Sequence, residues 1–166
     1  MQRWLVLLIP QIKEIIASFF NVSVREVQPD LRAFKDYGTI FKVGETTIIC
    51  RVRKVNRFMD SERYKREFTL CAERLHRLQA EYPRIVKGWG QYLLYGFAED
   101  NRVDYWWWGS LDVFRDWHDD LKSLNHQPHK AQFKAVKSLF NVYELKTFPQ
   151  AFILTSSHSR KQLQFL

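Results

Sequence analysis

The spacing of apolar residues changes along this chain from a helical period to a strand period. Between residues 4 and 20 they recur every three or four positions, at Leu5, Leu8, Ile9, Ile12, Ile15, Ile16 and Phe19. Pro10 either kinks this predicted helix or marks its start. Segments 38–43 and 46–53 are instead rich in β-branched residues and flank Gly44-Glu45, which is typical of a β-hairpin. A helix followed by a hairpin predicts an α/β fold, in which the helix packs on a sheet.

The rest of the chain continues this alternation. We expect a third strand at 67–71, a helix or loop at 72–82, strands at 91–98 and 103–108, and a short strand at 151–155. Ser110 is a suitable cap for a helix that ends near residue 121. The order of helix, three strands, helix, two strands and helix predicts a mixed sheet flanked by helices. We interpret residues 1–166 as one domain, with 125–166 as its C-terminal extension.

The net charge indicates what kind of partner the chain has. Lys and Arg number 26 against 18 Asp and Glu, which gives +8. Residues 51–66 hold seven cations and two acids (+5), whereas residues 99–120 hold two Arg and seven acids (−5). A localised excess of this kind favours a polyanion, with nucleic acid ahead of an anionic membrane and DNA ahead of RNA. A charge that serves solubility is the alternative, and an acidic DNA mimic is excluded.

Hydropathy and cysteine content predict a cytoplasmic protein without a membrane partner. The apolar segment 4–9 is too short for a signal sequence, and no segment approaches the roughly 18–20 apolar residues that span a bilayer. Cys50 and Cys71 are not in a Cys-x-x-Cys pair, so we expect two reduced, buried thiols, with a disulfide between them as the alternative. A homodimer is left open.

The basic segment is the first candidate site. Alternate residues of a strand share a face, so Arg51 and Arg53 should project together as two guanidinium groups suited to phosphate oxygens. The candidate nucleic-acid-binding residues are Arg51, Arg53, Lys54, Arg57, Arg63, Lys65 and Arg66. Phe58 and Tyr64 set rings beside these charges, as in grooves that bind single strands. A salt-bridged sheet edge, with Asp36 or Glu67 as the carboxylate, or a solvated loop would give the same pattern.

Other clusters are weaker candidates. Four aspartates share one predicted helix, at positions 112, 116, 119 and 120, and form either a solvated face or a Mg²⁺ site. His118 and His158 lack a Ser or Cys partner in a recognisable arrangement, and the His126/His129 pair lacks companion ligands for zinc. The Trp106–Trp108 run serves either the core or a protein partner.

The order of elements resembles the core of the PD-(D/E)xK, or restriction-endonuclease-like, nucleases. In that superfamily an Asp before the hairpin and an acid on its second strand bind Mg²⁺, and a Lys positions the attacking water. Asp36 matches the first acid, but Arg51-Val52-Arg53 stands where the acid-x-Lys motif would be. Arginine neither ligates a metal nor acts as a base at neutral pH. An active site would therefore need Asp36, Glu67 and Glu81 as Mg²⁺ ligands, with Asp36, Glu67, Arg51 and Arg53 as the catalytic set.

Residues 8–120 also resemble a group of bacterial and prophage proteins with no assigned activity. The shared motifs are the Asp before the hairpin, a strand that ends RVR, an EFT strand, GWG-x-Y-x-x-YGF at 88–97 and L-x-VFR-x-W at 111–117. This second resemblance supports the fold, whereas the resemblance to the nuclease superfamily implies a protein that interacts with nucleic acid and hydrolyses phosphodiester bonds with Mg²⁺. The alternative is a catalytically inactive nuclease-like module that binds nucleic acid or another protein.

Overall fold

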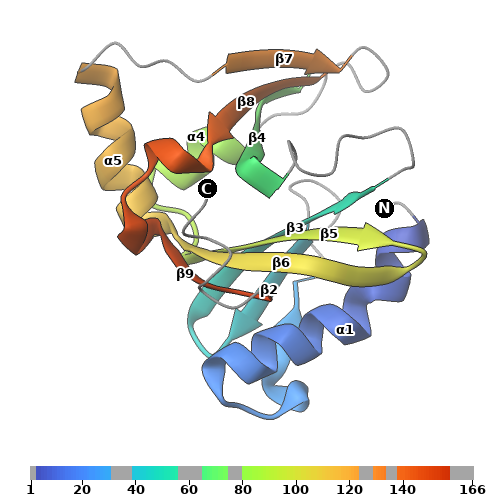
Figure 1. Cartoon of the computed structure of the whole chain (residues 1–166). Helices are drawn as coiled ribbons and strands as arrows, with labels where there is room; N and C mark the ends of the chain where they lie inside the picture. Colours follow the sequence, from blue (N-terminus) through green and yellow to red (C-terminus); the bar gives the residue numbers. More distant parts are fainter. Residues whose placement is uncertain are drawn as a thin grey trace.

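A computed structural model describes residues 3–30, 39–55, 65–74, 80–123, 129–133 and 138–157. Within these ranges it has two β-sheets and three α-helices (Figure 1). None of the helices in the described ranges has the length and apolar character needed to cross a bilayer. The predicted α/β class is therefore confirmed, with a mixed sheet at its centre.

The larger sheet has six strands in the order β1-β2-β3-β5-β6-β9. They are β1 (Val27–Pro29), β2 (Thr39–Val43), β3 (Thr46–Lys54), β5 (Tyr92–Glu99), β6 (Arg102–Ser110) and β9 (Ile153–Ser156). β3 and β5 pair in parallel, and all the other pairs of this sheet are antiparallel. The hairpin of β2 and β3 turns at Gly44-Glu45, as the sequence predicts.

Helix α1 (Arg3–Phe20) covers one face of this sheet (Figure 1). It continues through Pro10, so the proline lies inside the helix rather than at its start. The apolar stripe of α1 packs with Phe41, Ile48 and Cys50 of the hairpin. Trp108 of β6 is fully buried here, and its ring stacks on Phe19 with 4.1 Å between ring centroids.

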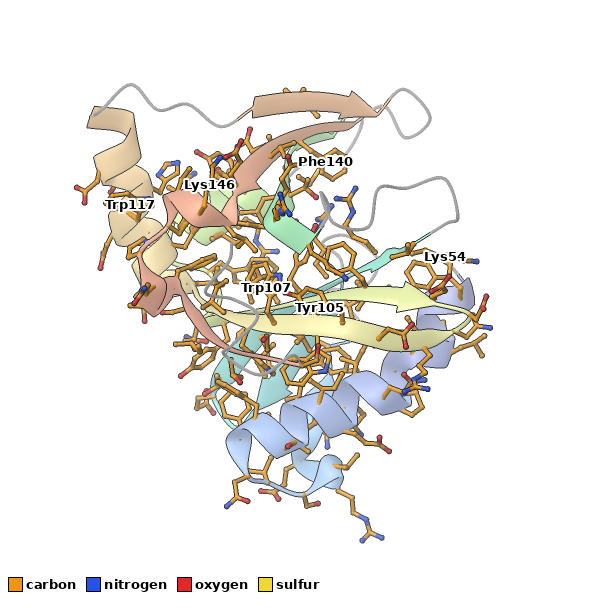
Figure 2. The ribbon with its side chains drawn as sticks, viewed as in Figure 1. Lys54, Tyr105, Trp107, Trp117, Phe140 and Lys146 are labelled. Atoms are coloured by element: carbon orange, nitrogen blue, oxygen red, sulfur yellow. The ribbon has the colours of Figure 1, made fainter. Side chains whose placement is uncertain are left out.

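The opposite face is covered by a second, three-stranded sheet with α4 (Glu81–Val86) and α5 (Leu111–Ser123) (Figure 1). Its strands run in the order β4-β8-β7 and are β4 (Glu67–Arg74), β8 (Ser138–Glu144) and β7 (His129–Phe133). Short 3-10 turns at η3 (Leu145–Thr147) and η4 (Gln150–Phe152) lead from β8 to β9, and η1 (Val24–Glu26) precedes β1. Phe68, Tyr95 and Trp107 pack together in the core on this side of the six-stranded sheet, where Figure 2 labels Trp107. Trp107 and Trp108 are both fully buried, so the tryptophan run serves the core at two of its three positions.

The third strand differs from the expectation. Residues 67–71 do form a strand, but β4 belongs to the second sheet instead of following the hairpin in the first. A parallel pair requires a long crossover connection, and residues 55–91 form the crossover between β3 and β5. β4 and α4 both lie in this crossover, which carries them over the face of the sheet and away from its edge.

Helix boundaries follow from local capping and from proline. Ser110 Oγ accepts a hydrogen bond from the Val113 N–H (3.4 Å), which confirms the predicted cap of α5. The residue before a proline disfavours helical backbone, so the sequence predicts that Pro83 begins a new element, but this proline is the third residue of α4. Proline is tolerated in a first turn because the N–H groups there have no partner within the helix. The mixed composition of residues 22–37 predicts irregular structure, but residues 27–29 form strand β1.

Gly90 closes the turn between α4 and β5 in a left-handed conformation (φ +77°). A Cβ there would come within 2.9 Å of Ile49 Cδ1 and 3.1 Å of Leu111 Cδ1. Gly44, in the hairpin turn, also has a positive φ (+56°), but a Cβ there would meet nothing within 4 Å. A side chain at Gly44 would therefore cause backbone strain alone, whereas a side chain at Gly90 would cause both backbone strain and crowding.

We expect Gly90→Ala to destabilise the protein more than Gly44→Ala. Both substitutions place alanine in the left-handed region, at a cost of about 1–2 kcal/mol. Only Gly90→Ala also overpacks the core, which adds about 1–3 kcal/mol. Urea unfolding of both variants measures the difference, and equal losses of stability would contradict the packing argument.

Candidate nucleic-acid interface

The C-terminal end of β3 carries the predicted arginine pair. Ile48 and Cys50 pack on the α1 side, whereas Ile49 packs on the side of the second sheet. By strand alternation Arg51 and Arg53 share the side of Ile49, so they face the second sheet together, as predicted. Lys54 ends the strand and is exposed (Figure 2).

Arg51 forms an ion pair with Glu81, through Nη1 and Oε2. The side chain of Glu81 is only 3% exposed, and that of Arg51 is 21% exposed. Glu81 Oε2 also accepts a hydrogen bond from the Cys71 N–H (3.3 Å). The Arg51 guanidinium lies 5.1 Å from the ring centroid of Phe140. This cluster joins β3, β4, α4 and β8, and we call Arg51, Glu81, Cys71 and Phe140 the arginine cluster.

Burial and charge act on Arg51 in opposite directions. Burial lowers the pKa of its guanidinium, whereas the Glu81 carboxylate raises it, and the net shift is upward. Arg51 is therefore charged at neutral pH. Burial also raises the pKa of the Cys50 thiol, and Glu81 adds to the effect, so Cys50 stays neutral. Cys50 and Cys71 are both buried and form no disulfide with each other, in agreement with the expected thiols.

A row of side chains continues from Arg53 across the sheet. Arg53 pairs with Phe97 of β5, which pairs with Tyr105 of β6. Lys65 Nζ lies 5.8 Å from the centroid of the Tyr105 ring. Since neighbouring strands are about 4.8 Å apart, Lys65 approaches the sheet roughly 10 Å from Arg53. The residues before β4 and the end of β3 therefore bring their cations to the same end of the molecule.

Five of the seven predicted nucleic-acid-binding residues lie in the described ranges. Arg51, Arg53 and Lys65 are partly buried, and Lys54 and Arg66 are exposed. The other two, Arg57 and Arg63, lie outside the described residues, as does Asp36. Among the described residues, Arg51 lies over the ring of Phe140 and Lys65 lies over the ring of Tyr105; both rings are labelled in Figure 2. Both rings lie far from the basic segment in the sequence. Phe58 and Tyr64, the rings predicted to accompany these charges, lie outside the described residues, so that pairing stays a prediction.

Glu67 and Glu81, two of the three carboxylates predicted to bind Mg²⁺, lie apart in the structure. Glu81 pairs with Arg51, a role that the sequence suggested for Asp36 or Glu67. Glu67 begins β4 opposite Glu144, four residues from Cys71, which corresponds to about 13 Å along a strand. No group of three metal-ligating side chains occurs among the described residues. Glu67 and Glu81 alone therefore do not make a Mg²⁺ site, and the role of Asp36 stays a prediction.

The acidic stripe of α5 faces solvent. Asp112, Asp116, Asp119 and Asp120 are all exposed, which agrees with a solvated face. Asp112 bonds to Arg115 Nη2 (2.5 Å), and Arg115 Nη1 donates to the carbonyl oxygens of Ile85 and Gly90 (3.2 Å each). Arg115 therefore ties α5 to the turn after α4.

A group of hydrogen-bonded polar side chains near α5 was not predicted from the sequence. His118 is 4% exposed, and its Nε2 lies 2.5 Å from Tyr82 Oη. His118 Nδ1 lies 3.3 Å from Asp119 Oδ1. Asn141 Nδ2 donates to the hydroxyl of Tyr143 (3.3 Å). The sequence places Asp119 next to His118, but Tyr82 lies 36 residues away in the chain, so local sequence could not predict its contact with His118.

Comparison of the chain with models of protein families, with curated proteins and with solved structures finds no match.

Arg51 and Glu81 should make strongly coupled contributions to the free energy of unfolding. We expect Arg51→Met to cost about 3–5 kcal/mol, because it leaves the Glu81 charge buried without its cation. Glu81→Gln should cost less, since Arg51 reaches solvent and the amide oxygen can still accept from the Cys71 N–H. The double variant should be more stable than Arg51→Met alone. Denaturant unfolding of the four proteins measures this cycle, and additive losses would show that the pair is not coupled.

Tyr143 should contribute to unfolding at alkaline pH. Burial raises the pKa of its hydroxyl, and nearby Tyr82 raises it further. Below pH 10 the hydroxyl is protonated in both the folded and the unfolded protein, so it adds no pH dependence. Above pH 10 it ionises only in the unfolded protein, and stability falls as pH rises. Tyr143→Phe should flatten this fall between pH 10 and 11, measured by urea unfolding, and an unchanged slope would refute the assignment.

Proposed function

We propose that this protein binds nucleic acid through the end of β3 and the start of β4. The observation that carries the proposal is that the end of β3 and the residues leading into β4 hold five described cations, and that Lys65 contacts the Tyr105 ring two strands away from Arg53: the five are Arg51, Arg53, Lys54, Lys65 and Arg66. Contacts with the rings of Phe140 and Tyr105 hold two of them in place. Phosphate neutralisation by such a group dominates affinity for nucleic acid.

The asymmetry of the charge supports binding over a general role in solubility. The acidic face of α5 belongs to a different part of the fold from the end of β3 (Figure 1). Exposed acids also occur in the β5–β6 hairpin, at Glu99, Asp100 and Asp104. A polyanion would therefore approach the cations from the side of the second sheet rather than from this hairpin. DNA is the first polymer to test.

Binding without hydrolysis accounts best for the described residues. One Glu81 oxygen already accepts from Arg51 and Cys71, and Glu67 is distant along β4. A nuclease-like fold with Mg²⁺ remains the second candidate, and it rests on the order of elements and on Asp36. Adding Mg²⁺ to the binding assay and resolving the products on a gel tests it, with Asp36→Ala as the control.

We expect the double charge reversal Lys54→Glu, Arg66→Glu to weaken binding to single-stranded and duplex oligonucleotides. Both side chains are exposed, so the reversal should leave the fold intact. The slope of log K against log salt should become shallower by about one for each lost phosphate contact. Fluorescence anisotropy over a range of NaCl concentrations measures both effects.

Lys42→Glu is the matched control. Lys42 is exposed on the same hairpin, and its cross-strand partner Thr47 lies seven residues from Lys54, about 23 Å along β3. Lys42→Glu should weaken binding much less than either single reversal at the basic end, Lys54→Glu or Arg66→Glu. An equal loss at Lys42 would indicate nonspecific attraction to net charge, and absence of salt-dependent binding by the wild type would refute the proposal.

A further inference from the structure

The Arg51 guanidinium is fixed from two directions within the arginine cluster. Its Nη1 bonds to Glu81 Oε2, and the group lies 5.1 Å from the centroid of the Phe140 ring. The carboxylate is almost wholly buried, at 3% exposure, whereas the arginine side chain keeps 21% of its surface exposed. The acid therefore lies on the protein side of the pair, and the cation reaches the surface.

Glu81 is itself held firmly. The oxygen that meets Arg51 also accepts from the Cys71 N–H (3.3 Å), and Glu81 begins α4. The carboxylate is thus tied to the backbone of β4 while it holds a side chain of β3. A side chain that is fixed in this way loses less conformational freedom when it binds a ligand.

The guanidinium still has donors for a second anion. It carries five N–H groups in a planar fork, of which the contact with Glu81 uses one. A fork of this kind matches the oxygens of a phosphate group in a bidentate arrangement. Arg53, two residues further along the same face of β3, adds a second guanidinium nearby.

We propose that Glu81 is a positioning residue, which holds Arg51 in the orientation that binds a phosphate group of the nucleic acid. This inference rests on the proposed function, because it assigns a role to one residue behind that surface. Glu81 does not touch the ligand. It acts through Arg51 alone.

A carboxylate beside a cation could instead weaken phosphate binding by cancelling its charge. The two roles give opposite results when the charge of Glu81 is removed. If Glu81 positions Arg51, Glu81→Gln loses a phosphate contact and binding weakens. If Glu81 merely cancels charge, the same substitution frees a cation and binding strengthens.

The experiment measures oligonucleotide affinity by anisotropy from low to moderate NaCl, with each variant first shown to be folded by circular dichroism. For Glu81→Gln we expect weaker binding and a slope of log K against log salt that is shallower by about 0.7–0.9, the value of one contact. Arg51→Gln should give the same change. The double variant Arg51→Gln, Glu81→Gln should bind like Arg51→Gln alone, because Glu81 acts only through Arg51.

Glu14→Gln is the control for the change in net charge. Glu14 is exposed on α1, which covers the opposite face of the six-stranded sheet from Arg51. Its removal should leave the salt slope unchanged. A structural role for Glu81 that does not involve the ligand would likewise leave the slope unchanged in the folded Glu81→Gln protein.

Tighter binding by Glu81→Gln, or an unchanged slope, would overturn the inference. So would losses that add in the double variant. These outcomes differ from failure of the proposed function, in which the wild type shows no salt-dependent binding or the reversals at Lys54 and Arg66 have no effect. Binding that responds to those reversals but not to Glu81→Gln would refute only the positioning role.

Discussion

Burial of the six-stranded sheet on both faces is the constraint on which the rest of the structure depends. α1 covers one face, and the crossover and the C-terminal strands cover the other (Figure 1). The central positions of β3 are therefore apolar in both directions, as Ile48, Ile49 and Cys50 are. Charged side chains on this strand are confined to its C-terminal end, where the two layers no longer enclose it completely. The location of the basic surface is thus a consequence of the packing.

The same constraint explains why Arg51 has a buried acid as its partner. Arg51 lies two residues beyond the fully buried Ile49, on the same face of the strand. A guanidinium so close to the core needs a carboxylate within reach, since an isolated charge there would cost several kcal/mol. The partner must come from the layer that covers this face. The crossover supplies it as Glu81, which lies just beyond β4 in the chain and next to it in space.

Much of the fold could be predicted from the sequence because the signals are local. The period of α1, the hairpin at Gly44-Glu45 and the Ser110 cap each depend on residues within a few positions of one another. The sheet to which β4 belongs could not be found in this way. Phe68 packs with Tyr143 from far along the chain, as a stacked pair with centroids 5.0 Å apart. Only the topology of the parallel β3–β5 pair determines that β4 lies over the sheet.

In the candidate site, too, local features could be predicted from the sequence and long-range contacts could not. Strand alternation was sufficient to predict that Arg51 and Arg53 share a face, and composition was sufficient to locate the excess of positive charge. The partner of Arg51 was predicted among nearby or strand-borne acids, but it is 30 residues away on a helix of the crossover. The resemblance to the nucleases suggests Glu81 only as a metal ligand. A side chain that is 3% exposed and bonded to an arginine is better suited to orient that arginine than to hold a hydrated cation.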